Sequence, residues 1–246
     1  MLKNVSALAT KMNCEIKTYK LGNLCKVVTA KSHTLPVQSN GKVKSTLYVS
    51  AKYELRSTLA TFTQEQKTTG YYLLSEHITD ALYYSFLLNS SIGVISLHND
   101  KNKSYTRGNV TKTKLVGMHI NVIPKRYTRA CNILELMIRR MKGLLVEGQA
   151  IIARDATIAF LEDMRNYIAL EIYMMSVFEK HQVSILKPWT DFIEREGNDY
   201  KISSLDKVFM SLYKSIVNPK NDIFDAMKKV RLFVGELGKD LKGGDE

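Results

Sequence analysis

The sequence is poor in the features that build disulfide frameworks, zinc sites and membrane spans. It has only three cysteines in 246 residues, Cys14, Cys25 and Cys131, and no two of them form a CxxC pair. An odd number without that spacing argues against a disulfide framework and against a zinc site. The longest apolar stretches, such as LLV and AIIA, are too short to span a bilayer, and the first residues hold no signal-peptide core. We therefore expect a reduced, cytoplasmic protein without a membrane segment.

Sequence motifs for catalysis are also missing. The chain has no GxxxxGK[ST], GxGxxG or GxSxG motif. Its five histidines stand apart, without HExxH or HxH spacing. His98 precedes Asn99 and Asp100, as in some nucleases, but a nuclease also needs a cluster of carboxylates to hold metal ions. Because the first half of the chain has few acids, we predict no enzymatic activity and no metal site.

The scarcity of acids is confined to one half of the chain. The net charge of the whole chain is +12. Residues 1–130 contain 19 Lys and Arg against 6 Asp and Glu, whereas residues 131–246 contain 17 against 18. An excess of positive charge in one half indicates a polyanionic partner for that half, and nucleic acid is the first candidate. An acidic surface on a partner protein is the alternative.

The first half also has the apolar spacing of strands. Residues 15–125 hold short apolar runs, separated by polar clusters with glycines near the breaks. The runs predicted as strands are LCKVVTA, TLYVSAKYEL, GYYLLS, SIGVISLH and MHINVI. One segment, 79–89, has helical spacing instead, with Ile78, Leu82 and Phe86 on its apolar face. We expect this helix to be architectural.

From Cys131 onward, apolar residues recur every three or four positions, which is typical of amphipathic helices. The pattern predicts a first helix with a break near 147–154 and a second helix over about 155–181. A turn is expected at Pro188–Trp189. A third helix is expected to be capped by Ser203 or Ser204 and ended by Pro219, and a fourth to be capped by Asn221 or Asp222. The expected fold class is α+β, with a strand-rich domain over residues 1–128 and an all-α helical domain over residues 129–246.

A basic segment lies near the end of the strand-rich half. From Asn99 to Arg129 there are eight Lys and Arg against one acid. Such side chains neutralise phosphates, and Arg and Asn can also pair with base edges. The candidate DNA-binding residues are Lys101, Lys103, Tyr105, Arg107, Asn109, Lys112 and Lys114, together with Lys42 and Lys44 from a second basic cluster. A solvated loop rich in lysine is the alternative interpretation.

Three stretches follow one another in a suggestive order. They are YKLGNLCKVVTAKS (19–32), ITDALYYSFLLNS (78–90) and GNVTKTKLVGMHINVIP (108–124), and a long helical pattern comes after them. In this order they resemble the opening strand and loop, the aromatic helix, and the Gly-x-x-(Thr/Lys)-x-x-x-Leu segment with its strand ending in Ile-Pro of a target recognition domain. That domain belongs to the specificity subunits of type I restriction–modification systems. The resemblance covers roughly residues 15–150.

The resemblance implies sequence-specific binding of double-stranded DNA, with the chemistry and its cofactor left to a methyltransferase subunit. The chain departs from the family in having IPKRYTRAC where a Pro-Pro-Leu-x-x-Gln closing is usual. It also has one recognition domain instead of two, so a homodimer through the helices would be needed to read a two-part target. The candidate partner or dimer interface is the stripe of Leu134, Ile138, Met141 and Leu145. Packing of that stripe within the same chain is the alternative.

Two other functions remain open at this point. The leading alternative is a non-catalytic interaction or inhibitory protein whose basic half docks on an acidic protein surface. The second is a metal-dependent nuclease. Salt-dependent, sequence-selective binding of DNA without cleavage would distinguish a DNA-recognition protein from both alternatives.

Overall fold

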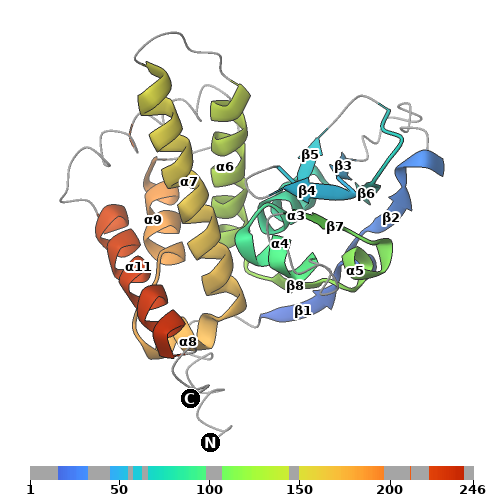
Figure 1. Cartoon of the computed structure of the whole chain (residues 1–246). Coiled ribbons are helices and arrows are strands. Elements are labelled where there is room, and N and C mark those ends of the chain that lie inside the picture. Colours follow the sequence, from blue (N-terminus) through green and yellow to red (C-terminus); the bar gives the residue numbers. More distant parts are fainter. Residues whose placement is uncertain are drawn as a thin grey trace, which may run out of the picture. The chain divides into compact units, whose positions relative to one another are not determined.

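The computed structural model describes residues 16–32, 45–54, 58–62, 66–97, 107–143, 150–196, 211 and 222–240. The chain is a mixed α+β protein with two compact units, which divide between Val122 and Ile123 (Figure 1). The sequence predicted a domain boundary after residue 128, but the first helix of the second unit already begins at Lys125. Residues 16–122 are called the strand-rich unit below, and residues 123–246 the helical unit.

The centre of the strand-rich unit is a four-stranded antiparallel sheet of order β2-β6-β3-β5. Its strands are β2 (Lys26–Thr29), β6 (Tyr71–Ser75), β3 (Ser45–Val49) and β5 (Ala60–Phe62). The alternating or β-branched runs KVVT, STLYV and YYLLS favour strands because such side chains pack well on a pleated surface. The predicted strands in LCKVVTA, TLYVSAKYEL and GYYLLS are thereby confirmed. The fully buried side chains of this sheet are Leu47, Val49, Ala60, Tyr72 and Leu73.

Helix α3 (Ile78–Leu88) packs against strands β3, β5 and β6 (Figure 1). The predicted helix over 79–89 is confirmed, and Phe86 is fully buried as expected. Ile78 is an exception because it is 52% exposed at the first turn. Just after the helix, the Asn89 side chain accepts a hydrogen bond from the Ala60 main-chain nitrogen at 2.8 Å and donates one to the Ala60 carbonyl oxygen at 2.9 Å. The amide thus takes the place of a neighbouring strand at the sheet edge.

The segment SIGVISLH is a helix, α4 (Ser91–Leu97), and its prediction as a strand is wrong. The Ser90 hydroxyl accepts a hydrogen bond from the Gly93 nitrogen at 3.2 Å, which satisfies a main-chain donor at the helix start. Gly93 also lies so close to the preceding helix that a Cβ there would stand 2.1 Å from the Leu87 carbonyl oxygen. The serine and the glycine therefore fix a tight corner between two helices.

Two further pairs of strands complete the strand-rich unit. Strand β1 (Lys17–Lys20) pairs with β8 (His119–Val122), and β4 (Lys52–Glu54) pairs with β7 (Arg107–Asn109), both antiparallel. The predicted strand in MHINVI is therefore confirmed. Three short helical segments follow strands of this unit: α2 (Leu21–Leu24) after β1, the 3₁₀ turn η1 (Ala30–Ser32) after β2, and α5 (Lys112–Gly117) after β7.

The helical unit contains α6 (Lys125–Gly143), α7 (Ala150–Tyr173), α8 (Met175–Lys180), α9 (Leu186–Glu196) and α11 (Asp222–Asp240). Helix α6 packs against α7 and α9, and α11 packs against the same two helices (Figure 1). The predicted helices are confirmed in outline, although α7 begins at Ala150, inside the break expected at 147–154, and the helix over 155–181 is interrupted at Met174. The predicted third helix lies outside the described residues, except for Ser211, which is helical.

The turn predicted at Pro188–Trp189 is wrong because both residues lie in the first turns of α9. Proline is tolerated near a helix start, where its missing N–H has no helical acceptor. Trp189 is fully buried, and its indole nitrogen donates a hydrogen bond to the Ala130 carbonyl oxygen of α6 at 2.9 Å. The only tryptophan of the chain therefore joins two helices of the core.

Two residues of the predicted dimer interface belong to that same core. Leu134 is fully buried and Ile138 is 1% exposed within the single chain. Their assignment to a seam between chains is wrong, since α6 turns this stripe toward α7 and α9. Met141 is half-buried, and Leu145 lies outside the described residues.

A charged network also joins α6 to α7. Glu135 is 1% exposed and accepts hydrogen bonds from Arg139 Nε at 3.0 Å and from Arg165 at 3.4 Å. Lys142 Nζ lies 2.6 Å from a carboxylate oxygen of Glu162. The buried carboxylate is thus compensated by two guanidinium groups, as a charge in a low-dielectric interior requires.

Among the described residues, no helix is both long enough and apolar enough to cross a membrane.

Candidate nucleic-acid interface

The basic segment predicted as a DNA-binding loop has regular structure from Arg107 onward. It forms strand β7, helix α5 and strand β8 in succession (Figure 1). Thr111 begins the helix, because its hydroxyl accepts a hydrogen bond from the Lys114 nitrogen at 3.3 Å. Leu115 is fully buried, whereas Lys112 is exposed and Lys114 is half-exposed. The pattern Thr-Lys-Thr-Lys-Leu thus supplies a cap, two cations at the surface and one apolar anchor.

Helix α5 is held closely against α2. A Cβ placed on Gly22 would stand 2.5 Å from Cγ1 of Val116, so only glycine allows this approach. The Leu21 nitrogen donates a hydrogen bond to the Met118 carbonyl oxygen at 2.8 Å, and Leu21 is fully buried. Strand β1 and α2 therefore form one local structure with α5 and β8, although nearly a hundred residues separate them in the sequence.

This local structure is rich in basic residues. Strand β1, α2, α5 and β8 contain Lys17, Lys20, Lys112, Lys114 and His119, and their sequences hold no Asp or Glu. All five side chains are exposed except that of Lys114, which is half-exposed. These five residues are called the basic surface below. The whole strand-rich unit has 14 Lys and Arg against 5 Asp and Glu, a net charge of +9.

The structure places only part of the predicted DNA-binding set. Asn109 is exposed on β7, where it faces the exposed Lys52 of β4 in the strand register. Arg107 lies on the same strand opposite Glu54. The predicted residues outside the described part of the chain are Lys42, Lys44, Lys101, Lys103 and Tyr105.

Lys17, Lys20 and His119 are members of the basic surface that the sequence analysis did not select. The two lysines lie far from the basic segment in the sequence and come beside it only through the pairing of β1 with β8. The sequence offered only one sign of their role, the absence of Asp and Glu from residues 16–53, and this does not place them beside α5.

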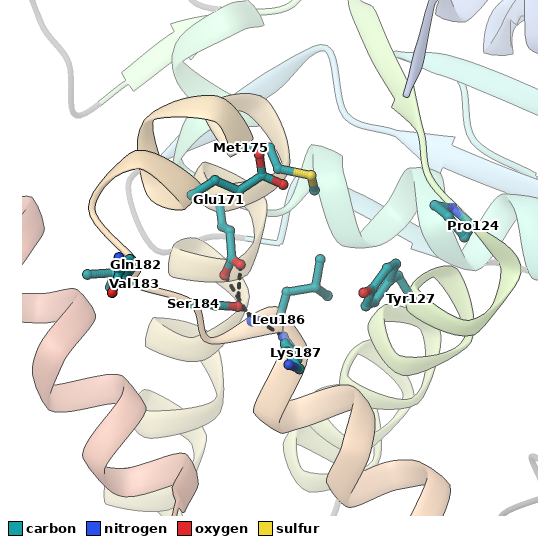
Figure 2. A pocket seen from close by; sticks show the side chains of 10 residues that line it. Pro124, Tyr127, Glu171, Met175, Gln182, Val183, Ser184, Leu186 and Lys187 are labelled. Atoms are coloured by element: carbon teal, nitrogen blue, oxygen red, sulfur yellow. Dashed lines mark hydrogen bonds between the residues drawn. The ribbon is translucent and has the colours of Figure 1, made fainter. Parts of the chain in front are cut away.

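A second candidate site is a cavity of about 230 Å³ in the helical unit. Figure 2 shows that Tyr127, Met175 and Leu186 surround it, with Glu171 beside the start of α9. Glu171 is 5% exposed, and its carboxylate accepts hydrogen bonds from the main-chain nitrogens of Ile185 at 2.8 Å and Leu186 at 2.9 Å.

These contacts give Glu171 a structural role. Burial raises the pKa of its carboxyl group above the ordinary value, against the opposing effect of hydrogen bonds from Ser184 and from the two main-chain nitrogens. Orphan N–H groups at a helix start need acceptors, and this carboxylate supplies them for α9. The acid is thus occupied in joining the α8–α9 connection to α7.

Other chemistry has little support in the described residues. Within the ranges given above, no group of three or more His, Cys, Asp or Glu side chains is placed to hold a metal ion. Cys25 and Cys131 are buried, and burial raises the pKa of the Cys25 thiol to about 12, which keeps it protonated and unreactive. The basic surface is therefore the strongest candidate site.

No family model, curated protein or solved structure matches the chain.

Proposed function

We propose that the strand-rich unit binds double-stranded DNA in a sequence-specific manner, as a target recognition component of a type I restriction–modification-like system. The observation that supports this proposal is the basic surface, where Lys17, Lys20, Lys112 and His119 are exposed on elements without any acid. Lysines that approach phosphates release condensed counterions, which gives affinity for any duplex. Exposed Asn and Thr side chains beside them are donors and acceptors suited to base edges.

The type I assignment rests on the resemblance of three stretches, and their contacts agree with it. The stretch 19–32 contains α2, and the stretch 108–124 contains α5 and β8. These two stretches meet through the close approach of Gly22 to Val116. This contact is compatible with the two stretches belonging to one domain. In this proposal the chain supplies recognition, and a methyltransferase subunit bound at the helical unit supplies catalysis.

The test compares two pairs of lysines that remove the same charge from different units. Lys112→Ala/Lys114→Ala removes two cations from α5, and Lys228→Ala/Lys229→Ala removes two exposed cations from α11. Binding to a mixed-sequence duplex is measured by fluorescence anisotropy between about 50 and 200 mM salt. We expect the α5 variant to weaken binding to all sequences and to lower the salt slope by about 1 to 2. The α11 variant should leave the slope unchanged.

Three outcomes would contradict the proposal. Equal effects of the two variants would mean that only the total charge of the chain matters, without a local interface. Absence of duplex binding by the wild-type protein, together with binding to an acidic protein, would favour the alternative of a non-catalytic interaction protein. Cleavage of a plasmid in the presence of magnesium would instead indicate a nuclease.

A further inference from the structure

The pairing of β1 with β8 places four polar side chains on one face of a two-stranded ribbon. The register sets Thr18 opposite Asn121 and Lys20 opposite His119. Because residues directly opposite each other in an antiparallel pair share a face, these four lie on the same side. Thr18, Lys20 and His119 are exposed and Asn121 is half-exposed. They are called the polar face of the ribbon below.

The opposite face of the ribbon is attached to the rest of the strand-rich unit. Ile120 on that face is fully buried. In addition, the Tyr83 hydroxyl of α3 donates a hydrogen bond to the Asn121 carbonyl oxygen at 2.7 Å. Within the described residues β1 and β8 form a sheet of two strands only. The ribbon is therefore anchored at Ile120 and at the Asn121 main chain, although Lys17, Tyr19 and Val122 on the same face as Ile120 are exposed.

One hydrogen bond prepares the centre of the polar face. The Thr18 hydroxyl donates to Oδ1 of Asn121 at 2.7 Å across the two strands. The terminal torsion of an asparagine is otherwise broad, so this contact fixes the orientation of the amide. An oriented Asn amide can recognise adenine through its N6 and N7 positions in the major groove. Lys20 and His119 lie next to this pair on the same face, where they can reach phosphates or base acceptors.

The dimensions of the ribbon suit the groove as well. The major groove of B-form DNA is about 12 Å wide and admits a two-stranded β-ribbon. Strand-based readers of this kind are an established mode of DNA recognition. Lys112 and Lys114 on the adjacent α5 would then contact the phosphate backbone at the edge of the groove.

We infer that the polar face of the β1–β8 ribbon enters the major groove and that Asn121, positioned by Thr18, reads a base pair there. This inference rests on the proposed binding of double-stranded DNA and assigns its base-reading element. It gives the two parts of the surface different tasks. The lysines of α5 supply affinity for any sequence, and the ribbon supplies preference for particular bases.

The test is a selection from a pool of duplexes with a randomised centre, carried out with the full chain. Wild-type protein should enrich a motif. Asn121→Ala should reduce the preference at one position of that motif by about 5- to 150-fold, while its affinity for unselected duplex stays within about 2-fold. Thr18→Val should weaken the preference at the same position by a smaller factor, since it removes the orienting hydroxyl and keeps the amide. The matched control is Val122→Thr, which changes the other face of the same strand and should leave the motif unchanged.

Folding of these variants is checked by thermal unfolding. The Tyr83 hydrogen bond is made to the main chain of Asn121, so Asn121→Ala retains it. A motif that is unchanged in Asn121→Ala, with wild-type affinity, would overturn this inference and leave the proposed function intact. Binding without any enriched motif would overturn both the inference and the sequence specificity of the proposed function, while leaving duplex binding intact. If the wild-type chain bound no duplex at all, the proposed function and the inference would both fail.

Discussion

The strand-rich unit and the helical unit use their charged side chains in opposite ways. In the helical unit, residues 123–246 contain 20 Lys and Arg against 18 Asp and Glu, which leaves a net charge of only +2. Cations there pair with acids between helices, as Arg165 does with Glu135 and Lys142 with Glu162. In the strand-rich unit, by contrast, the basic surface lies on four elements that contain no acid.

This difference separates charge that supports the fold from charge that meets a partner. A buried ion needs a counterion in the same chain, because desolvation is otherwise too costly. Lysines that are concentrated on elements without acidic residues give the charge distribution that the proposed binding of a polyanion requires. Mutations in the helical unit should therefore change stability, and mutations on the basic surface should change binding.

The largest effect that we expect comes from the core of the strand-rich unit. Phe86→Ala removes a fully buried aromatic side chain from α3 and should lower the free energy of unfolding by about 3–5 kcal/mol. The control is Ile78→Ala on the same helix, where the side chain is 52% exposed and the expected change is within about 0.5 kcal/mol. Both are measured by denaturant unfolding.

DNA binding by the same variants separates architecture from recognition. For Phe86→Ala, the fraction of protein that binds should fall only in proportion to the unfolded fraction. Intact stability with abolished binding would place α3 on the DNA face and would break the division between stabilising and binding residues in this unit.

The next effect concerns the charged network of the helical unit. Glu135→Gln keeps the size of the side chain but leaves Arg165, which is 8% exposed, without its buried counterion. We expect a loss of about 3 kcal/mol in the free energy of unfolding, at the low end for a broken buried pair, because Arg165 keeps only its contact with the more exposed Glu162. The control is Arg231→Ala, which breaks the exposed pair with Asp163 and should cost at most about 1 kcal/mol.

The DNA affinity of Glu135→Gln tests whether charges of the helical unit serve stability alone. At temperatures where Glu135→Gln is folded, its affinity for DNA and its salt slope should equal those of the wild-type protein. A change in slope as large as that from the α5 lysines would show that charges of the helical unit also face the nucleic acid.

Local patterns predicted the elements that depend on local interactions. The predicted strands in GYYLLS and MHINVI correspond to β6 and β8. The apolar spacing around Phe86 predicted both ends of α3 to within one residue. SIGVISLH was predicted wrongly because a short apolar run fits either a strand or a helix. Two contacts favour the helix: the hydrogen bond to the Ser90 hydroxyl and the close approach of Gly93 to the main chain of Leu87. The second contact depends on how α4 packs against α3, which the local sequence does not show.

Only the α5 part of the candidate site could be predicted from the sequence. Thr111, Lys112 and Lys114 lie in a segment whose composition alone marks it as basic, although the sequence suggested a loop where α5 forms. Lys17 and Lys20 could not be assigned to the same surface, since the pairing of β1 with β8 joins residues about a hundred positions apart. Strand register over that distance is set by the packing of the whole unit and not by local propensity.

The smallest expected effect tests the contact that assembles the basic surface. Gly22→Ala would place a Cβ 2.5 Å from Cγ1 of Val116 on α5, so the Val116 side chain or the helix that carries it must shift. Overpacking of this kind costs about 1–3 kcal/mol in the free energy of unfolding. The control is Gly235→Ala on α11, where no atom lies within 4 Å of the added Cβ, and where alanine should stabilise the helix by about 0.5–1 kcal/mol.

A second substitution makes the cause of that effect specific. Val116→Ala removes the methyl group that meets the new Cβ, so the double variant should recover stability, with a coupling of about 0.5–3 kcal/mol in a double-mutant cycle. Because Gly22→Ala shifts Lys112 and Lys114 relative to Lys20, it should also weaken binding to mixed-sequence duplex, and the double variant should restore it. If Gly22→Ala destabilised the protein but bound DNA with wild-type affinity when folded, the two halves of the basic surface would not act together. Recognition would then belong to α5 or to the ribbon alone, and the selection with Asn121→Ala would decide between them.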